Sequence, residues 1–154
     1  MKGQKLNNKD ISIKRLSKQD ILLTKQLILL FRTVFEMKKA KTPGKSYLKE
    51  LLRKPNFVAY IALYKNTVIG GLTAYELPMV YSEGSEMFIY DIAVKHEFQR
   101  NGIGKKLILA LQKYCKQHRI KEIFVAANEE DTHALEFYRS AKGKAESVVH
   151  FTIN

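Results

Sequence analysis

Cysteine, tryptophan and long apolar runs are scarce or absent in this chain. Of its 154 residues, one is cysteine and none is tryptophan. The single Cys115 cannot form a disulfide within the chain, which favours a reducing compartment such as the cytoplasm. No apolar run approaches the roughly 20 residues that a membrane-spanning helix needs, and the polar residues 1–10 contain no apolar segment typical of a secretory signal. We therefore expect a cytoplasmic protein without a membrane partner.

Metal-ligating residues lack the spacing that a metal site requires. The chain has four histidines, and no two of them stand at ligand spacing. The segment 96–100 begins like the H-E-x-x-H zinc motif but places Arg100 where the second histidine should be. Cys115 falls within a helical pattern, which we interpret as a packed thiol rather than a nucleophile. The sequence thus predicts no metal cofactor.

Acidic residues are few compared with basic ones. Lys and Arg total 27 against 15 Asp and Glu, a formal net charge of +12. Such a charge fits nucleic-acid binding, or a lysine-rich solvated surface that attracts an anionic cofactor. The lysines are scattered and no nucleic-acid motif is present, so we expect the anionic cofactor and no nucleic-acid partner. The same charge disfavours a polycationic substrate unless its cleft is locally acidic.

The length and the apolar periodicity predict one domain of α/β (α+β mixed) class. We expect the domain over residues 11–154, preceded by a loose tail over residues 1–10. The elements follow the order β-α-α-β-β-β-α-β-α-β, which predicts a mixed sheet with helices on its faces. Strands are expected at 11–16, 57–64, 68–77, 87–94, 122–127 and 147–153. Ser17 and Asp20 form a capping box, after which a helix is expected to about residue 36. Further helices are expected at 46–54, 105–117 and 132–140.

A short loop, residues 99–104, is the most informative segment of the chain. It follows the apolar strand 87–94 and precedes the amphipathic helix that begins at Lys105. Backbone N–H groups at a helix N-terminus lack intrahelical partners, and the helix dipole adds positive potential there. Gly102 and Gly104 would let the backbone approach a phosphate without a Cβ in the way. The segment therefore predicts a site for a ligand that contains pyrophosphate.

Side chains of this loop could add to the site. Arg100 could donate a charge-assisted bond to the phosphates, or it could simply be solvated. Gln99 could brace the loop. A dinucleotide-binding fingerprint is excluded because Leu107 stands where its third glycine is required. The residues expected to bind the cofactor here are Gln99, Arg100, Asn101, Gly102, Ile103, Gly104 and Lys105.

Asp91 is the most informative acidic residue, because it lies in an otherwise apolar strand. A buried carboxylate without a partner is costly, so either a substrate ammonium or a structural lysine or arginine should accompany it. The residues alone leave both alternatives open. Other acidic residues stand beside the expected site and could form either a cation-binding patch or ordinary solvated loops. These are Glu83, Glu86, Glu129, Glu130 and Asp131.

Three groups of residues carry a family resemblance. The pattern Gln-x-x-Gly-x-Gly between a strand and a helix resembles the acetyl-CoA loop of the GCN5-related N-acetyltransferases (GNAT superfamily), and residues 137–140 before Gly143 resemble its second conserved block. Over about residues 11–154 the chain resembles the aminoglycoside 3-N-acetyltransferases of that superfamily. The matching residues are Tyr47-Leu48, Leu51-Leu52, Phe57, Ala74-Tyr75, Leu77-Pro78, Ser85-Glu86, Tyr90 to Val94 and Val149-His150-Phe151.

The resemblance implies a GNAT-like, mostly antiparallel central sheet with helices on both faces. It implies acetyl-CoA as cosubstrate and direct transfer of acetyl to a primary amine, in particular the 3-amino group of an aminoglycoside, which would give antibiotic resistance. It also implies a homodimer. Two alternatives stay open: an acetyltransferase for a polyamine, a small metabolite amine or a protein lysine, and a non-catalytic module that binds CoA or nucleic acid.

On the cofactor side, the resemblance implies that backbone groups of Ile92, Ala93 and Val94 pair with the pantetheine arm as an added strand would. One N–H of this stretch would face the thioester oxygen like an oxyanion hole. Asn128, at the end of a strand beside the expected cleft, would either hydrogen-bond the pantetheine or cap the helix that follows.

On the acceptor side, the resemblance assigns Asp91 the role of amine anchor or base, with Tyr90 as its neighbour. Tyr138 would donate a hydrogen bond to the leaving thiolate; its alternative is an aromatic residue packed on the sheet. One departure concerns the turn after this tyrosine. Relatives often carry glycine or a small apolar residue just before Gly143, and Lys142 stands there in this chain.

Overall fold

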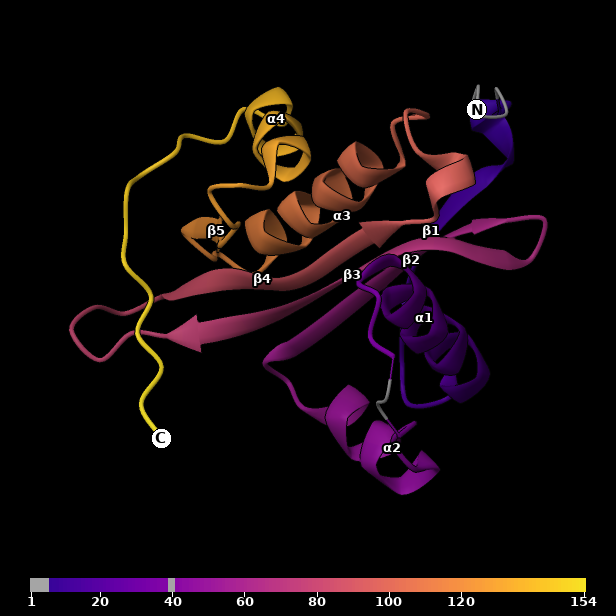
Figure 1. The fold of residues 1–154 in the computed structure, drawn as a ribbon. Coiled ribbons are helices and arrows are strands. Elements are labelled where there is room, and N and C mark those ends of the chain that lie inside the picture. The colour runs from indigo at the N-terminus through magenta and orange to yellow at the C-terminus, as the bar shows by residue number, and fades with distance from the viewer. Residues whose placement is uncertain (1–5, 39–40) are drawn as a thin grey trace.

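A five-stranded sheet lies between two layers of helices in this computed structural model, which describes residues 6–38 and 41–154. Helices α1 and α2 cover one face of the sheet, and α3 and α4 cover the other (Figure 1). The strands are β1 (Ile11–Arg15), β2 (Phe57–Tyr64), β3 (Thr67–Pro78), β4 (Ser85–Val94) and β5 (Glu122–Val125). The helices are α1 (Ile21–Val34), α2 (Lys45–Arg53), α3 (Ile103–Gln117) and α4 (Thr132–Ser140), with short 3-10 turns at Asn8–Asp10 and His96–Phe98.

The strands follow one another across the sheet in sequence order, β1-β2-β3-β4-β5. Each neighbouring pair is antiparallel except β4 and β5, which are parallel. Helix α3 makes the crossover that a parallel pair requires. The mixed, mostly antiparallel sheet with helices on both faces confirms the expected fold class.

Two apolar cores, one on each face of the sheet, hold the layers together. Helix α3 buries Ile103, Leu107 and Leu111, spaced four residues apart, so that one helical stripe faces the sheet. Helix α1 buries Leu27 and Leu30 in the second core. We call these the α3 core and the α1 core. In the α3 core the sheet contributes Val58, Ile69, Leu72, Met87 and Ile89, and in the α1 core it contributes Phe57, Ala59, Ile61, Val68 and Ala93.

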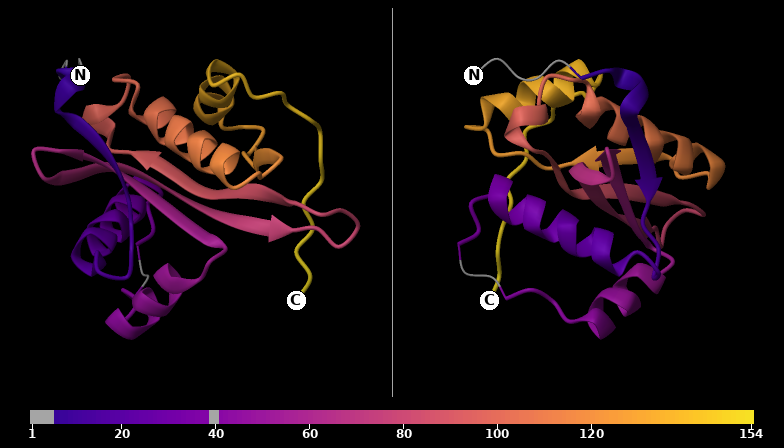
Figure 2. Two further views of the ribbon diagram at one scale, coloured as in Figure 1. Left: turned by 180° about the vertical axis from the view of Figure 1, so that it is seen from behind. Right: turned by 90° about the vertical axis from the view of Figure 1, so that its right-hand side faces the viewer.

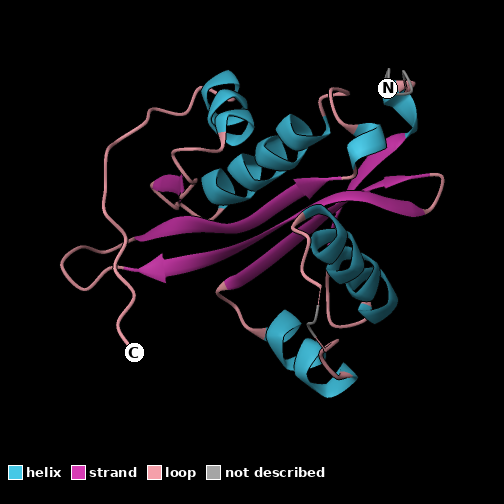
Figure 3. Ribbon diagram, in the orientation of Figure 1, coloured by secondary structure: helices cyan, strands magenta, loops and turns pink. Residues whose placement is uncertain are grey.

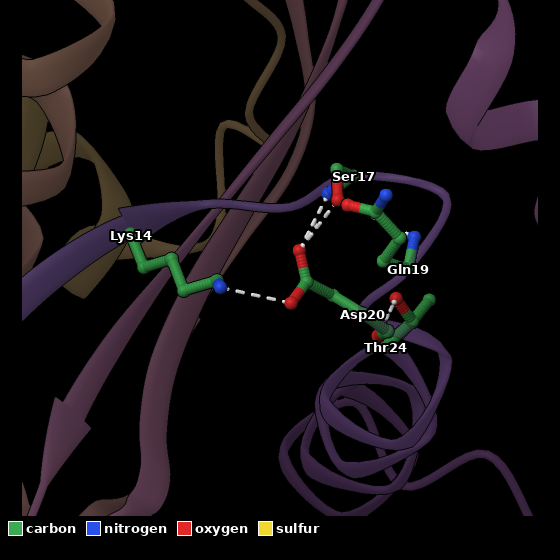
Figure 4. Close-up of polar contacts among 5 residues, drawn as sticks. All are labelled: Lys14, Ser17, Gln19, Asp20 and Thr24. Atoms are coloured by element: carbon green, nitrogen blue, oxygen red, sulfur yellow. Dashed lines mark hydrogen bonds and ion pairs between the residues drawn. The ribbon is translucent and has the colours of Figure 1, made fainter.

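The start of α1 is fixed by Asp20 (Figure 4). Its carboxylate accepts hydrogen bonds from the backbone N–H and the hydroxyl of Ser17, both 2.9 Å long, and pairs with Lys14 at 2.8 Å. Burial by itself would raise the pKa of Asp20, but the bonds from Lys14 and Ser17 outweigh it, and the pKa is lowered. Ser17 and Asp20 thus make the contact expected of a capping box, but the regular helix begins only at Ile21, with Asp20 at the N-cap position and no side-chain cap bond there.

The predicted strand at 147–153 is wrong. This segment forms no strand in the structure and runs as an extended loop away from α4 (Figure 3). Its alternating apolar pattern is typical of a strand, but no edge of the sheet lies alongside it, so its backbone has no ladder to join. The preceding strand, expected to reach residue 127, ends at Val125.

The first ten residues were expected to form a loose tail, and residues 1–5 lie outside the described part. Leu6 contacts the α3 core, and its backbone N–H donates to Oδ1 of Asn101 at 3.2 Å. This bond ties the N-terminal segment to the loop that precedes α3. None of the helices in the described ranges is long and apolar enough to cross a membrane.

Candidate functional site

The parallel strands β4 and β5 separate part-way along the sheet. Their ladder ends where Ile89 pairs with Val125, while β4 continues to Val94. Beyond this pair, residues 90–94 have no partner strand on their β5 side. The backbone groups of Ile92, Ala93 and Val94 therefore border an opening in the sheet, as an added extended ligand would require.

A β-bulge at Tyr90 sets which side chains face this opening. Ala74 pairs with Ile89 and Thr73 pairs with Asp91, so Tyr90 has no opposite residue. Ile89 and Ile92 both contact the α3 core, although an unbroken strand would turn residues three apart to opposite faces. The bulge thus turns both Tyr90 and Asp91 toward the α1 side of the sheet.

Asp91 is half-buried and accepts a 2.9 Å hydrogen bond on Oδ2 from the hydroxyl of Thr73. Burial raises the pKa of Asp91, and the bond from Thr73 offsets only part of the effect. No charged group contributes to this shift, so within the described residues no lysine or arginine compensates the carboxylate. Of the two partners left open by the sequence, a substrate ammonium fits this environment better than a structural cation.

Aromatic rings surround Asp91 on the same face. Tyr90 contacts Tyr75 and Phe88 edge-on, with ring centroids 5.8 and 5.9 Å apart. The chain of contacts continues from Phe88 to Phe124 of β5, stacked at 5.1 Å, and from Tyr75 to Phe57 at 5.2 Å. We call these five residues the aromatic wall. Phe57 at one end of the wall is buried in the α1 core, whereas Tyr90 is 65% exposed and presents its ring to a ligand.

The predicted acidic residues lie around this wall on different elements. Glu86 alternates with the core-facing Met87 on β4, which turns it to the same face as Asp91. Glu83 lies in the loop between β3 and β4. Glu129 and Glu130 lie in the loop after β5, at the end of the sheet where β4 also ends, because the two strands are parallel.

Asp131 caps α4, since its Oδ1 accepts from the backbone N–H of Ala134 at 3.0 Å. Asn128 was expected either to contact the pantetheine or to cap this helix, and the residue that caps it is Asp131. The side chain of Asn128 is exposed, and its backbone carbonyl accepts from the N–H of Asp131 at 3.0 Å. Asn128 stays a predicted pantetheine contact.

The loop before α3 has the geometry of an anion site. Gly102 is the N-cap in a left-handed conformation with φ 73°, no side chain caps the helix, and a Cβ on Gly102 would meet nothing within 4 Å. The first turn contains Lys105 and Lys106 and no acidic residue. Lysines next to a helix N-terminus are unfavourable with the helix dipole, so their presence fits a bound anion.

Side chains brace this loop from within. Gln99 donates from Nε2 to the carbonyl of Val94 at 3.2 Å, which joins the loop to the end of β4. Asn101 donates from Nδ2 to the carbonyls of Phe98 and Gln99, both at 3.1 Å. Arg100 is exposed and has a positive φ of 63°. The backbone is thereby held in one shape before any ligand binds.

Gly104 has a packing role that the sequence did not predict. A Cβ at this position would lie 2.7 Å from Cε2 and 2.8 Å from Cζ of Phe137, closer than atoms of a folded protein pack. Glycine is needed at 104 because the Phe137 ring of α4 lies against the first turn of α3. A Cβ at Gly102 would leave the approach to a phosphate open as well, whereas glycine at 104 is required by the contact between the two helices; Gly104 stays a predicted contact of the cofactor.

Tyr138 contacts the α3 core from α4 and lines a cavity of about 540 Å³ together with Ile89 and Val125, the last pair of the β4–β5 ladder. Burial, with a smaller effect from Asp131, raises the pKa of Tyr138 to about 12. Tyr138 and Asp91 thus lie on opposite faces of the sheet beside the same opening. At neutral pH the phenol keeps its proton and can donate it in a hydrogen bond.

The turn after α4 explains the departure at Lys142. Lys142 has a positive φ of 67°, and the N–H of Gly143 donates to the carbonyl of Tyr138 at 2.9 Å. A left-handed residue at this place is a common helix ending, usually glycine. Lys142 adopts the same left-handed conformation here, so the turn keeps its geometry although the backbone of Lys142 is strained.

Cys115 lines the same cavity as Tyr138. Cys115 is buried in α3, and burial raises the pKa of its thiol to about 11, which fits the expected packed thiol. Within the described ranges no three His, Cys, Asp or Glu residues gather where they could hold a metal ion. A separate cavity of about 560 Å³ between α1 and α2 is lined by Lys18, Lys25, Lys45, Lys49 and Arg53, and would repel a polycation.

Comparison with known proteins matches this architecture to one family. Residues 25–143 match the Acetyltransferase (GNAT) family. The chain belongs to the GNAT family of acetyltransferases. Among curated proteins, none matches this GNAT chain in sequence.

Solved structures of other GNAT proteins resemble it over nearly its whole length. The aminoglycoside acetyltransferase meta-AAC0020, from an uncultured soil metagenomic sample, is 43% identical in its complex with trehalose, with a TM-score of 0.92 over 96% of this chain and 97% of that one. Its complex with sisomicin gives 42% identity and a TM-score of 0.93 over the same shares. Aminoglycoside acetyltransferase HMB0005, from a similar sample, is 34% identical with a TM-score of 0.89 over 94% and 97%.

More distant likeness concerns the fold alone. AAC(6')-Iy in complex with the bisubstrate analog CoA-S-monomethyl-acetylneamine is 18% identical, with a TM-score of 0.74 over 94% of this chain and 98% of that one. This GNAT chain is therefore an acetyltransferase close to aminoglycoside acetyltransferases, and the position of the acetylated amine is not determined by these similarities.

Sequence reasoning missed several residues of the site. Thr73, the hydrogen-bond partner of Asp91, and Phe124, the end of the aromatic wall, lie on different strands from Asp91 and become its neighbours only through strand pairing. The run of aromatic residues at 88 and 90 was a usable signal for the wall. Nothing local predicted Thr73, because its role depends on the register across the bulge.

Proposed function

We propose that this protein transfers acetyl from acetyl-CoA directly to a primary amine, the 3-amino group of an aminoglycoside. One observation carries the proposal. Asp91 is a half-buried carboxylate without a cationic partner among the described residues, and it lies within the aromatic wall at the opening between β4 and β5. An acceptor ammonium bound there would compensate the carboxylate and bring its nitrogen to the edge of the cofactor site.

The cofactor would occupy the opening and the α3 N-terminus. Backbone N–H groups of residues 99–105 would bind the pyrophosphate, with Arg100 and Lys105 as nearby cations. The backbone of Ile92 to Val94, which has no partner strand on its β5 side, would pair with the pantetheine, and Asn128 would reach it from the end of β5. An N–H of this edge would also polarise the thioester carbonyl.

Asp91 would anchor the amine and take its proton. A carboxylate whose pKa is raised by burial is a stronger base than a solvated one, so the environment of Asp91 favours this role. A lysine amine has a pKa of about 10.4 and is almost entirely protonated at neutral pH. An aminoglycoside amine flanked by other cations loses its proton more easily, which lessens the demand on Asp91.

Tyr138 would stabilise the leaving thiolate as a hydrogen-bond donor. Its pKa of about 12 lies roughly 3.5 above the usual thiol value of about 8.5. Complete proton transfer from the phenol to the thiolate is therefore strongly uphill. A donated hydrogen bond requires no such transfer and still lowers the energy of the developing charge.

The acidic residues around the wall support a polycationic acceptor. Glu86 lies five residues before Asp91 on the same face. Because of the bulge, the two residues stand opposite Leu77 and Thr73, which are four residues or about 13 Å apart along β3. Glu83, Glu129 and Glu130 would extend the negative surface at the two ends of this stretch. Binding of sisomicin by a 42% identical relative supports the same class of acceptor. In this proposal the protein is a homodimer that works in the cytoplasm and gives aminoglycoside resistance.

The test is CoA thiol release from acetyl-CoA with a panel of amines. The panel contains aminoglycosides with and without a free 3-amine, others with and without a free 6′-amine, spermidine and a lysine peptide, and the acetylated position is read by mass spectrometry and NMR. We expect release only when the 3-amine is free. Asp91→Asn should abolish it, while the matched Asp10→Asn, an exposed carboxylate beside the far edge strand β1, should leave it unchanged.

Other outcomes would separate the alternatives. Acetylation at the 6′-amine would refute the 3-amine assignment but keep the aminoglycoside. Release with spermidine or the peptide alone would make the acceptor another amine. CoA binding without release from any acceptor would favour the non-catalytic module. In bacteria that express the gene, an unchanged inhibitory concentration of an acetylated aminoglycoside would refute the resistance role.

A further inference from the structure

The cavity between α1 and α2 is surrounded by positive charge. Its volume is about 560 Å³, and five cationic side chains line it: Lys18 and Lys25 on the α1 side, and Lys45, Lys49 and Arg53 on the α2 side. None of the described residues that line it is an aspartate or a glutamate. Helices α1 and α2 lie on the face of the sheet away from α3 and α4 (Figure 2). The cavity is therefore separate from the proposed pyrophosphate loop, which precedes α3.

Helix α2 collects its cations on one side. Lys45, Lys49 and Arg53 follow one another at intervals of four residues, so their side chains lie along a single stripe of the helix. Glu50, the one acidic residue of α2, is turned about 100° away from Lys49 around the helix axis. Like charges four residues apart repel each other and destabilise a helix. The stripe therefore lowers the stability of the free protein, and a bound anion would remove this cost.

The chain itself leaves these charges uncompensated. Within the described ranges, none of the five cations forms an ion pair. Asp20 is the acidic residue closest in sequence to Lys18, but its carboxylate already pairs with Lys14 at 2.8 Å and accepts two hydrogen bonds from Ser17. The two sides of the cavity thus carry charge of the same sign, which favours a ligand of the opposite sign.

The size and the remaining lining of the cavity indicate the kind of anion. Cavities of about 300–1,000 Å³ hold small molecules. Lysine ammonium groups and the arginine guanidinium bind phosphate oxygens through charge-assisted hydrogen bonds. A nucleic acid would require a groove of cations that follows its backbone, whereas these five surround one cavity. Leu22, which is 77% exposed, also lines the cavity and gives the ligand an apolar contact.

We propose that the cavity between α1 and α2 binds a small anion with several phosphate groups, held from both helices by the five cations. The ligand would join α1 to α2 and compensate the repulsion within the α2 stripe. Inorganic polyphosphate and nucleoside triphosphates share this chemistry, and contact of a base with Leu22 distinguishes them. The inference does not depend on the proposed acetyl transfer, because neither Asp91 nor the loop before α3 lines this cavity.

Isothermal titration calorimetry of the full chain with tripolyphosphate and with ATP tests the site. In about 50 mM NaCl both probes should bind, and added salt should weaken binding because the cations are largely exposed. Lys49→Gln and Arg53→Gln should each raise the dissociation constant about 10-fold or more, since each removes charge-assisted bonds to phosphate. The matched control Lys113→Gln, an exposed lysine of α3, should change it less than about 2-fold. Leu22→Ser should weaken the binding of ATP but not of tripolyphosphate if the ligand is a nucleotide, and of neither if it is a phosphate chain alone.

The melting temperature provides a second readout, which separates a ligand site from ordinary solvated lysines. Lys49→Gln removes the repulsion from both Lys45 and Arg53, so the free variant should melt about 1–4 °C higher than the wild-type chain. Glutamine and lysine have nearly the same helix propensity, so this shift reports the charge. Tripolyphosphate should raise the melting temperature of the wild-type chain and have little effect on the variant. Solvated lysines without a ligand site would not give this last difference.

Four results would overturn the inference. The first is no binding of either probe at about 1 mM. The second is equal weakening by Lys49→Gln and Lys113→Gln, which would show attraction to the net charge alone. The third is binding that Lys105→Gln weakens and Lys49→Gln does not, which would place the probe at the loop before α3. The fourth is a single-stranded oligonucleotide that binds through Lys49 more tightly than ATP does, which would make the cavity part of a nucleic-acid interface.

Thiol release measured on the same samples keeps this inference separate from the reaction. A protein that binds both probes but has no transferase activity would contradict the proposed reaction alone. An active protein that binds neither probe would contradict the anion site alone.

Discussion

Replacement of Gly104 by alanine tests the contact between α3 and α4. The added Cβ would lie 2.7 Å from the Phe137 ring, so the ring or the helix must move. Overpacking of this kind costs about 1–3 kcal/mol. Alanine in a helix gains up to about 1 kcal/mol over glycine, which opposes the steric cost. The expected net effect is a loss of 0 to about 2 kcal/mol, or up to about 8 °C in the melting temperature.

Gly104→Ala should stabilise the protein instead of destabilising it when the ring of Phe137 is removed. In a Phe137→Ala background the added Cβ has space, and only the helix propensity remains, so Gly104→Ala should stabilise by up to about 1 kcal/mol. Urea denaturation of the four proteins of this cycle measures the coupling energy. Gly44→Ala is the control, because a Cβ there meets nothing within 4 Å and φ is −69°. Equal effects of Gly104→Ala in both backgrounds would show that the ring does not require the glycine.

Four further substitutions test the site and its supports. Asp91→Asn should reduce kcat about 100-fold or more, as measured by thiol release. Because burial raises the folded pKa of Asp91, the substitution should also increase the free energy of unfolding at pH 7, and this gain should vanish as the pH falls below the unfolded pKa. Tyr138→Phe should lower kcat on the order of 100-fold with little change in KM, as measured by steady-state thiol release. Asp20→Ala should cost about 1–2 kcal/mol in urea denaturation at pH 7, and, because the pKa of Asp20 is lowered, this cost should shrink as the pH falls through its folded pKa. Lys142→Gly should relieve the positive φ and raise the melting temperature by about 2–4 °C; no change or a decrease would contradict the strain assigned to this turn.

Elements with strong local signals could be predicted from the sequence. The strand predicted at 57–64 has the observed bounds of β2, because an apolar run is closed by a turn whose Lys65 and Asn66 both have positive φ, as a tight hairpin requires. Helix α4 also has its predicted bounds, since Asp131 supplies the cap and the turn at Lys142 ends the helix.

Features that depend on distant pairing could not be predicted. The bulge at Tyr90 leaves the apolar pattern of its strand unchanged and appears only in the register with β3. The need for glycine at 104 comes from Phe137, 33 residues further along the chain. The strand expected at 147–153 is absent, because an alternating apolar pattern does not show which sheet edge would accept it, and no edge within this molecule does so.

The bulge at Tyr90 also limits how the length of β4 can change. Side chains on a strand alternate with a period of two, so the loss or gain of one residue between the bulge and the loop before α3 would turn Asp91 into the α3 core, among Ile89 and Leu107. A change of two residues would keep its direction but move it along the opening by about 7 Å. When homologues that act on other acceptors are aligned with this chain, we therefore expect insertions and deletions in this strand to have even length. Each change of two residues would move the carboxylate by about 7 Å relative to the cofactor.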